Sequence, residues 1–173
     1  MATSLYDMSV PTYIQTVGAV AGYLDRGLAH CTDNNIDPES VVETRLFPDM
    51  LPFRFQIQSV AHHSLGTVKG LKEGVFHPPS DLAQLDFKGL QGLMADTLAA
   101  LKAYAPEEIN ALEGGDMAFD FRGFKMPFTA ETFVLSFSLP NVHFHATTAY
   151  DILRMKGVPL GKRDYMGALR LKG

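Results

Sequence analysis

Histidines are the side chains of this chain best suited to chemistry at neutral pH, because imidazole can bind a divalent metal or exchange a proton there. Four of the six histidines form two close pairs, His62 with His63 and His143 with His145. Both pairs lie in segments whose apolar residues recur at the three- and four-residue steps of a helix. If these two helices pack together, one histidine from each can reach a shared site.

Only one histidine of each pair can face such a site, because successive helical residues point about 100° apart. In the first pair, His62 shares its flank with Gln58 and Lys69, which prefer water, so we predict that His63 points inward. In the second pair, His145 shares its flank with small or polar residues that leave room for an imidazole. We therefore predict His63 and His145 to be the inward members.

The predicted site holds a divalent metal such as zinc, nickel or iron, bound by His63 and His145, with a third ligand that would be Asn141 or a residue that the sequence does not place. Asn141 lies one turn before His145 and would contribute its amide oxygen. The pocket around the metal would be lined by side chains that can hydrogen-bond a small molecule, namely Tyr13, Gln56 and Tyr150. The alternative, and the commoner state of a histidine in an apolar helix, is that these imidazoles are hydrogen-bonded core residues.

Four helices are predicted to position these residues, over residues 9–32, 51–71, 82–104 and 129–156. Ser80 or Asp81 is the expected N-cap of the third helix, and Thr129 of the fourth. Pro140 should kink the fourth helix, which is apolar almost all round and is therefore expected to be deeply buried. The predicted fold is an all-α four-helix bundle, with residues 1–173 forming a single domain because no linker is visible.

A short β-hairpin is predicted before the last helix. Between Met117 and Phe128 the apolar residues alternate with period two, and Arg122-Gly123 stands between the two runs as a turn. This hairpin carries four phenylalanines, Phe119, Phe121, Phe124 and Phe128. A two-stranded element this apolar would favour a partner, so we expect a homodimer.

Composition narrows the classes of function and the compartment. The formal net charge of −4 provides no basic face for nucleic acid. A single cysteine, Cys31, cannot form an internal disulfide, which is typical of a reducing compartment. No run of about 18 apolar residues predicts a membrane span, and the first ten residues do not have the pattern of a secretory signal. We expect a cytoplasmic protein that binds neither nucleic acid nor membrane.

Several segments of the chain resemble one family of bacterial proteins, the DUF1993 family. The strongest likeness is the run Asn141-Val142-His143-Phe144-His145-Ala146-Thr147-Thr148-Ala149-Tyr150-Asp151-Ile152-Leu153-Arg154, followed by Gly157-Val158-Pro159-Leu160-Gly161-Lys162. The opening Ser4-Leu5-Tyr6-Asp7-Met8-Ser9-Val10-Pro11 and the step Asp49-Met50-Leu51-Pro52 are also similar to it. The resemblance covers nearly the whole chain.

That resemblance implies membership of the DinB/YfiT-like metalloenzyme superfamily, whose fold is a four-helix bundle in up-down-down-up order. It also implies a metal held by one histidine of the second helix and an H-x-x-x-H step on the last. His63 matches the first of these ligands and His145 the end of the step, whereas Asn141 replaces the other histidine. An amide oxygen binds transition metals more weakly than imidazole, so this departure weakens the site.

Two functions follow as expectations. Because the superfamily includes thiol transferases and a maleylpyruvate isomerase that use low-molecular-weight thiols, the resemblance implies a metal-dependent small-molecule (thiol) transferase or hydrolase. Its pocket would lie between the second and fourth helices. The alternative is a non-catalytic bundle with a degenerate metal site that acts through ligand binding or homodimerisation. The sequence leaves open whether the chain is an enzyme.

Overall fold

The computed structural model describes residues 3–79 and 82–172, and most of them are helical. Two of the long helices contain one turn of π-helix each, labelled η. The helical segments are α1 (Leu5–Met8), α2 (Val10–Asp33), α3 (Glu39–Val42), α4 (Phe53–Ala61), η1 (His62–Gly66), α5 (Thr67–Glu73), α6 (Phe87–Lys102), α7 (Pro106–Asn110), α8 (Ala130–Phe133), η2 (Val134–Ser138), α9 (Leu139–Met155) and α10 (Lys162–Met166).

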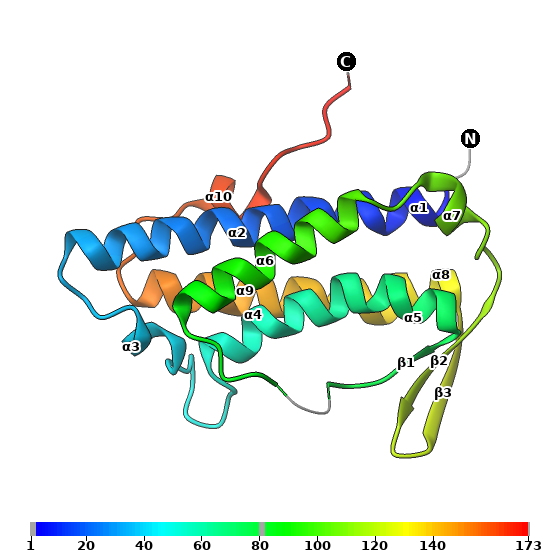
Figure 1. The fold of residues 1–173 in the computed structure, drawn as a ribbon, viewed down its shortest axis with the longest axis horizontal. Helices are drawn as coiled ribbons and strands as arrows, with labels where there is room; N and C mark the ends of the chain where they lie inside the picture. Colours follow the sequence, from blue (N-terminus) through cyan, green and yellow to red (C-terminus); the bar gives the residue numbers. More distant parts are fainter. Residues whose placement is uncertain (1–2, 80–81, 173) are drawn as a thin grey trace.

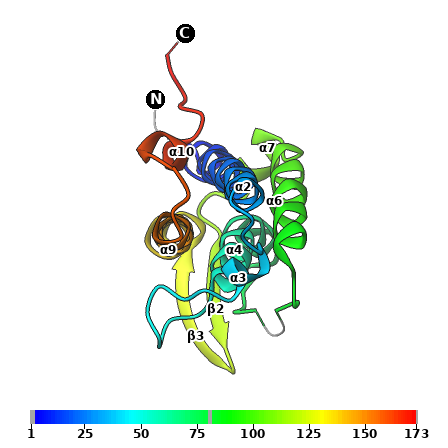
Figure 2. The same cartoon turned by 90° about the vertical axis from the view of Figure 1, so that its left-hand side faces the viewer.

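The long helical segments α2, α4–η1–α5, α6 and α8–η2–α9 lie side by side (Figure 2). α2 packs along α6, and α4 packs along α9, while further contacts join α2 to α9 and α4 to α6. The short α10 crosses over α2, so the C-terminal segment returns to the side of the N-terminus (Figure 1). Among residues 3–79 and 82–172, no helix is both long and apolar enough to cross a lipid bilayer.

The core lies between these four segments. Every third or fourth residue of α2 is buried, which is the spacing of one helix face: Tyr13, Val17, Val20, Leu24, Gly27 and Cys31. Gly27 lets α9 and α6 approach, because a Cβ there would meet Leu153 at 3.2 Å and Phe87 at 3.3 Å. Burial also raises the pKa of the Cys31 thiol and keeps it protonated.

A three-stranded sheet covers one end of the helices (Figure 1). Its strands are β1 (Val75–Phe76), β2 (Asp116–Phe121) and β3 (Phe124–Thr129), with β1 parallel to β2 and β2 antiparallel to β3. The predicted hairpin is confirmed, and both of its turn residues have positive φ, 53° at Arg122 and 86° at Gly123, as a tight type I′ turn requires. Strand β1 was not predicted, because two residues show no periodicity.

The last helix differs from the prediction in burial and in its internal geometry. Thr129 caps α8 as predicted, but Leu135, Phe144 and Met155 are each more than half exposed, so this helix buries only one face. Pro140 is the second residue of α9, directly after η2. The wider π turn gives the proline ring room against the preceding turn and lets the helix continue through it.

The third long helix begins later than predicted. α6 starts at Phe87, and the carboxylate of Asp86 caps it by accepting from Gly89 N at 2.7 Å. Leu82 and Leu85 have helical spacing but lie in the non-helical segment before this cap. The predicted caps Ser80 and Asp81 fall outside the described residues.

Candidate functional site

His63 and His145 are brought together, as predicted from the sequence. Their ring centroids lie 5.6 Å apart and the ring planes are inclined by 13°. His63 comes from η1 and His145 from α9, and both are half-buried. The walls around the pair are aromatic, with Phe76 and Phe137 against His63, and Phe55 and Phe144 against His145.

Gln56 on α4 decides which nitrogen of His145 carries the proton. The Gln56 side chain is 2% exposed, and its Nε2 donates to the carbonyl of Leu51 at 2.8 Å. A carbonyl only accepts, so the other amide atom is Oε1, which lies 2.8 Å from His145 Nδ1. His145 therefore donates from Nδ1 and presents an unprotonated Nε2. This is how a second residue orients a metal-binding or proton-accepting imidazole.

His63 has the opposite arrangement. Its Nδ1 is buried and has no hydrogen-bond partner among residues 3–79 and 82–172. A buried N–H without an acceptor costs more free energy than a buried lone pair without a donor. The greater rarity of unpaired buried N–H groups in proteins is a sign of this cost. We infer that the proton is on Nε2. The pair then presents one donor, on His63, and one acceptor, on His145.

Both imidazoles are neutral at pH 7. Burial lowers the pKa of His145 to about 4. Burial, together with the smaller effects of nearby His145 and His62, lowers the pKa of His63 to about 3, because a second positive charge beside the first would be repelled. Neither ring competes for a proton at neutral pH, so both are free to hydrogen-bond a ligand.

A buried hydroxyl network holds the His63 backbone. Ser138 of η2 donates to the His63 carbonyl at 2.6 Å, and Thr67 lies within hydrogen-bond distance of both groups. Since the one Ser138 proton is used in this way, the fully buried Tyr13 hydroxyl must donate to Ser138 Oγ, 2.6 Å away. Burial raises the pKa of Tyr13 and keeps it protonated for this role. The network thus joins α2, η1 and η2 behind the histidine pair.

The predicted metal ligands do not fit a resident tetrahedral metal. No group of three or more His, Cys, Asp or Glu side chains able to hold an ion occurs in the described part of the chain. Asn141 donates its amide to Phe137 O at 2.7 Å, which leaves only a weak amide oxygen for a metal. His63 could offer Nε2 only by moving its proton to the buried Nδ1, where no acceptor lies. Of the two predicted imidazole ligands, His145 has among the described residues the outer partner that a metal-binding histidine normally has, and His63 Nδ1 has none.

The three predicted pocket residues have different roles. Gln56 contacts the pair and orients His145, and Tyr13 lies behind the pair in the hydroxyl network. Tyr150 packs edge-on against Tyr23 and Tyr165, at centroid distances of 6.3 and 6.0 Å, and makes no described contact with either histidine. Sequence reasoning missed the network, although Ser138 lies on the same flank of the last helix as His145.

The comparisons with known proteins agree with this fold. A family model described as "Domain of unknown function (DUF1993)" matches residues 5–166. The chain belongs to the DUF1993 family. Among solved structures, this DUF1993 protein is similar to a DinB family member from Shewanella denitrificans, with a TM-score of 0.82 and 24% identity over 98% of this chain and 95% of that one. No curated protein matches the chain.

Proposed function

We propose that this DUF1993 protein binds a small molecule at the His63–His145 pair through one hydrogen-bond donor and one acceptor. The observation that carries the proposal is the orientation of His145 by Gln56, which aims an unprotonated Nε2 from an aromatic wall beside His63. A ligand with an X–H group, such as a thiol, could donate to His145 and accept from His63. The flanking Phe55 and Phe137 rings would bury its apolar part.

Ligand binding with a degenerate metal site is the version of the function that we favour. The similarity to a DinB family member supports a four-helix bundle in up-down-down-up order, the arrangement in which a metal-dependent thiol transferase or hydrolase was expected. The missing third ligand and the buried Nδ1 of His63 weigh against a metal. A His145 pKa of about 4 also makes its imidazole a weak base toward a thiol, whose pKa is about 8.5. Ligand binding therefore requires only a hydrogen-bond acceptor at His145, whereas proton abstraction would require a stronger base.

The first test combines elemental analysis with nitrogen NMR of the histidines. Protein purified without a histidine tag or chelator is compared with His145→Ala and with the control His143→Ala, whose ring contacts Tyr165 instead. We expect no stoichiometric zinc, nickel or iron in any sample, and a proton on Nδ1 of His145 and on Nε2 of His63. Near-stoichiometric metal that is lost only in His145→Ala would overturn the proposal and make metal-assisted chemistry the working hypothesis.

The second test concerns the ligand class. Glutathione is titrated into the labelled protein, with S-methyl glutathione as a probe that lacks the thiol proton. We expect saturable shifts of His145 Nε2 with the thiol and weaker binding, by about two- to tenfold, with the methylated probe, the usual cost of one neutral hydrogen bond. Equal binding of both probes, or saturable shifts of His63 that remain in His145→Ala, would contradict recognition by this pair.

A further inference from the structure

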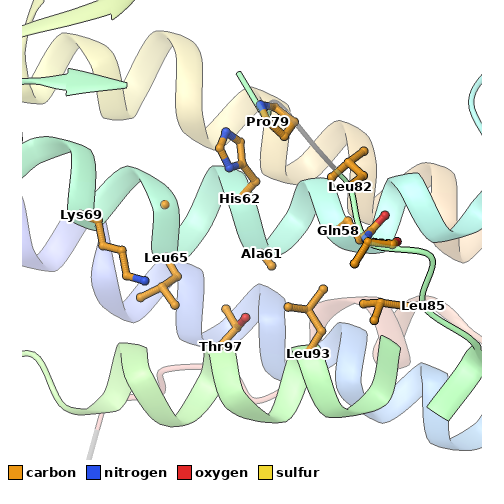
Figure 3. Close-up of a pocket in the computed structure, with 12 residues that line it drawn as sticks. Gln58, Ala61, His62, Leu65, Lys69, Pro79, Leu82, Leu85, Leu93 and Thr97 are labelled. Atoms are coloured by element: carbon orange, nitrogen blue, oxygen red, sulfur yellow. Dashed lines mark hydrogen bonds between the residues drawn. The ribbon is translucent and has the colours of Figure 1, made fainter. Parts of the chain in front are cut away.

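A second pocket lies on another flank of the helix that carries His63, between α4–α5 and α6 (Figure 3). Its volume is about 440 Å³, within the usual range for small-molecule sites. Leu65 and Ala61 lie on one side of it, opposite Thr97 and Leu93 of α6, and Leu82 and Leu85 lie at one end (Figure 3). Four of the side chains that line it can hydrogen-bond, namely Gln58, His62, Lys69 and Thr97.

His62 presents an unprotonated nitrogen in this pocket. Its Nε2 lies 2.8 Å from the carbonyl of His77, which can only accept, so the proton is on Nε2 and Nδ1 is bare. Burial lowers the pKa of His62 and keeps the ring neutral. Gly66 leaves the space beside this nitrogen open, because a Cβ at Gly66 would lie 3.4 Å from Nδ1.

Gln58 is a second polar side chain that lines this pocket, and one of its atoms is unpaired. Its side chain is 6% exposed and Nε2 donates to the carbonyl of Ala83 at 2.8 Å. Its Oε1 is buried and has no donor among the residues that the structure describes. A buried acceptor without a partner costs free energy, and a bound donor would recover it.

Lys69 marks the other end of the pocket, beyond Leu65 (Figure 3). It follows His62 by seven residues, so the two backbones are about 10 Å apart along the helix, a span that a small molecule and the lysine stem can bridge together. A cationic ammonium at this end favours an anionic group on the ligand. The leucines between the two ends favour an apolar body.

We propose that this pocket binds a small apolar molecule that carries an N–H donor at one end and a carboxylate at the other. The N–H donates to His62 Nδ1, the carboxylate pairs with Lys69, and the body packs between Leu65 and Leu93. This site does not depend on the proposed function of the His63–His145 pair. The rings of His62 and His63 are neighbours, 5.5 Å apart, but His62 lines this pocket and His63 stacks on His145.

Indole-3-acetate is a suitable probe, because it has a ring N–H, a flat apolar body and a carboxylate. Two relatives remove one feature each: 1-methylindole-3-acetate lacks the N–H and 3-methylindole lacks the carboxylate. By NMR titration we expect saturable shifts at His62 and at the Leu93 methyl groups, and a Kd about five- to tenfold higher for each relative. No saturable shift at these residues up to about 5 mM probe, equal affinity for all three probes, or shifts centred on His145 would overturn the proposal.

Two variants test the pocket without removing a structural hydrogen bond. Gly66→Ala narrows the space beside His62 Nδ1, and Lys69→Met removes the charge of an exposed side chain while keeping its stem. We expect each to raise the Kd for indole-3-acetate at least about fivefold with unchanged urea unfolding, and His145→Ala to leave the Kd unchanged. Unaltered affinity in Gly66→Ala and Lys69→Met, or a loss of affinity in His145→Ala, would refute this site.

Discussion

Ser138 is the position at which the hydroxyl network behind the histidine pair can be broken with little change in volume. Its Oγ accepts from Tyr13 and donates to the His63 carbonyl, and both the Tyr13 and the Ser138 side chains are fully buried. Ser138→Ala removes this oxygen. The His63 carbonyl keeps the Thr67 hydroxyl at 2.8 Å, whereas the Tyr13 hydroxyl loses the acceptor that it used.

The expected loss of stability follows from these partners. Leaving the buried Tyr13 hydroxyl unpaired costs about 1–3 kcal/mol, and the lost bond to the His63 carbonyl adds about 1 kcal/mol. Ser138→Ala should therefore lower the free energy of unfolding by about 3 kcal/mol. Tyr13→Phe removes the donor instead and leaves Ser138 bonded to Thr67 and His63, so it should cost about 1 kcal/mol.

The assay is a double-mutant cycle. Each variant is unfolded in urea at neutral pH, and the circular dichroism of the helices is used to monitor unfolding. With a urea m-value of about 2 kcal/mol/M, Ser138→Ala should lower the midpoint by about 1.5 M. In the Ser138→Ala background, Tyr13→Phe should cost nothing or recover about 1 kcal/mol, because it removes the orphaned hydroxyl. If Tyr13→Phe costs the same in both backgrounds within about 0.5 kcal/mol, the two hydroxyls are not coupled and this account of the network is wrong.

Three further predictions concern the histidine pair and the assembly. Gln56→Leu should release His145 from its Nδ1–H form, so nitrogen NMR should find a mixture of both tautomers; an unchanged tautomer would rule out Gln56 as the orienting residue. Because folding lowers the pKa of His145 to about 4 and of His63 to about 3, the unfolded chain binds more protons, and stability should be full above about pH 6.5 and fall by roughly 6 kcal/mol toward pH 4. A variant with both histidines replaced by Gln should give a flatter profile in urea unfolding. With Phe124 66% exposed on the hairpin, we expect a homodimer that Phe124→Ser weakens, and a monomer of the unaltered protein at micromolar concentration in light scattering would contradict this expectation.

Local signals predicted those parts of the fold that depend on a few adjacent residues. The Arg122-Gly123 turn was identified because tight hairpins need two residues with positive φ, and Thr129 because its hydroxyl can cap the next helix. The start of α6 was missed because Leu82 and Leu85 continue the helical spacing of Leu90. Those two leucines close a pocket instead, and helical spacing alone does not distinguish that role from a helix face.

The partners of individual side chains in the site were less predictable. Choosing His63 and His145 required only the direction in which each points, and the structure brings this pair together. The role of Gln56 required knowing that Leu51 O would take its Nε2, a contact set by the loop before α4. The flank with Gln58 and Lys69 was expected to face water because both side chains are polar, yet Gln58 is buried and helps to line the second pocket.

The π turn at His62–Gly66 also limits how this helix can vary in length. A π turn holds about one residue more than an α turn, so five residues of π turn cover about the same rotation as four residues of α-helix. Deleting one residue within 62–66 would therefore turn it into ordinary α-helix and leave Val68 and Leu71 facing the core. The deletion would instead change the face on which the imidazoles lie, so it should displace the histidine pair while the rest of the helix keeps its packing.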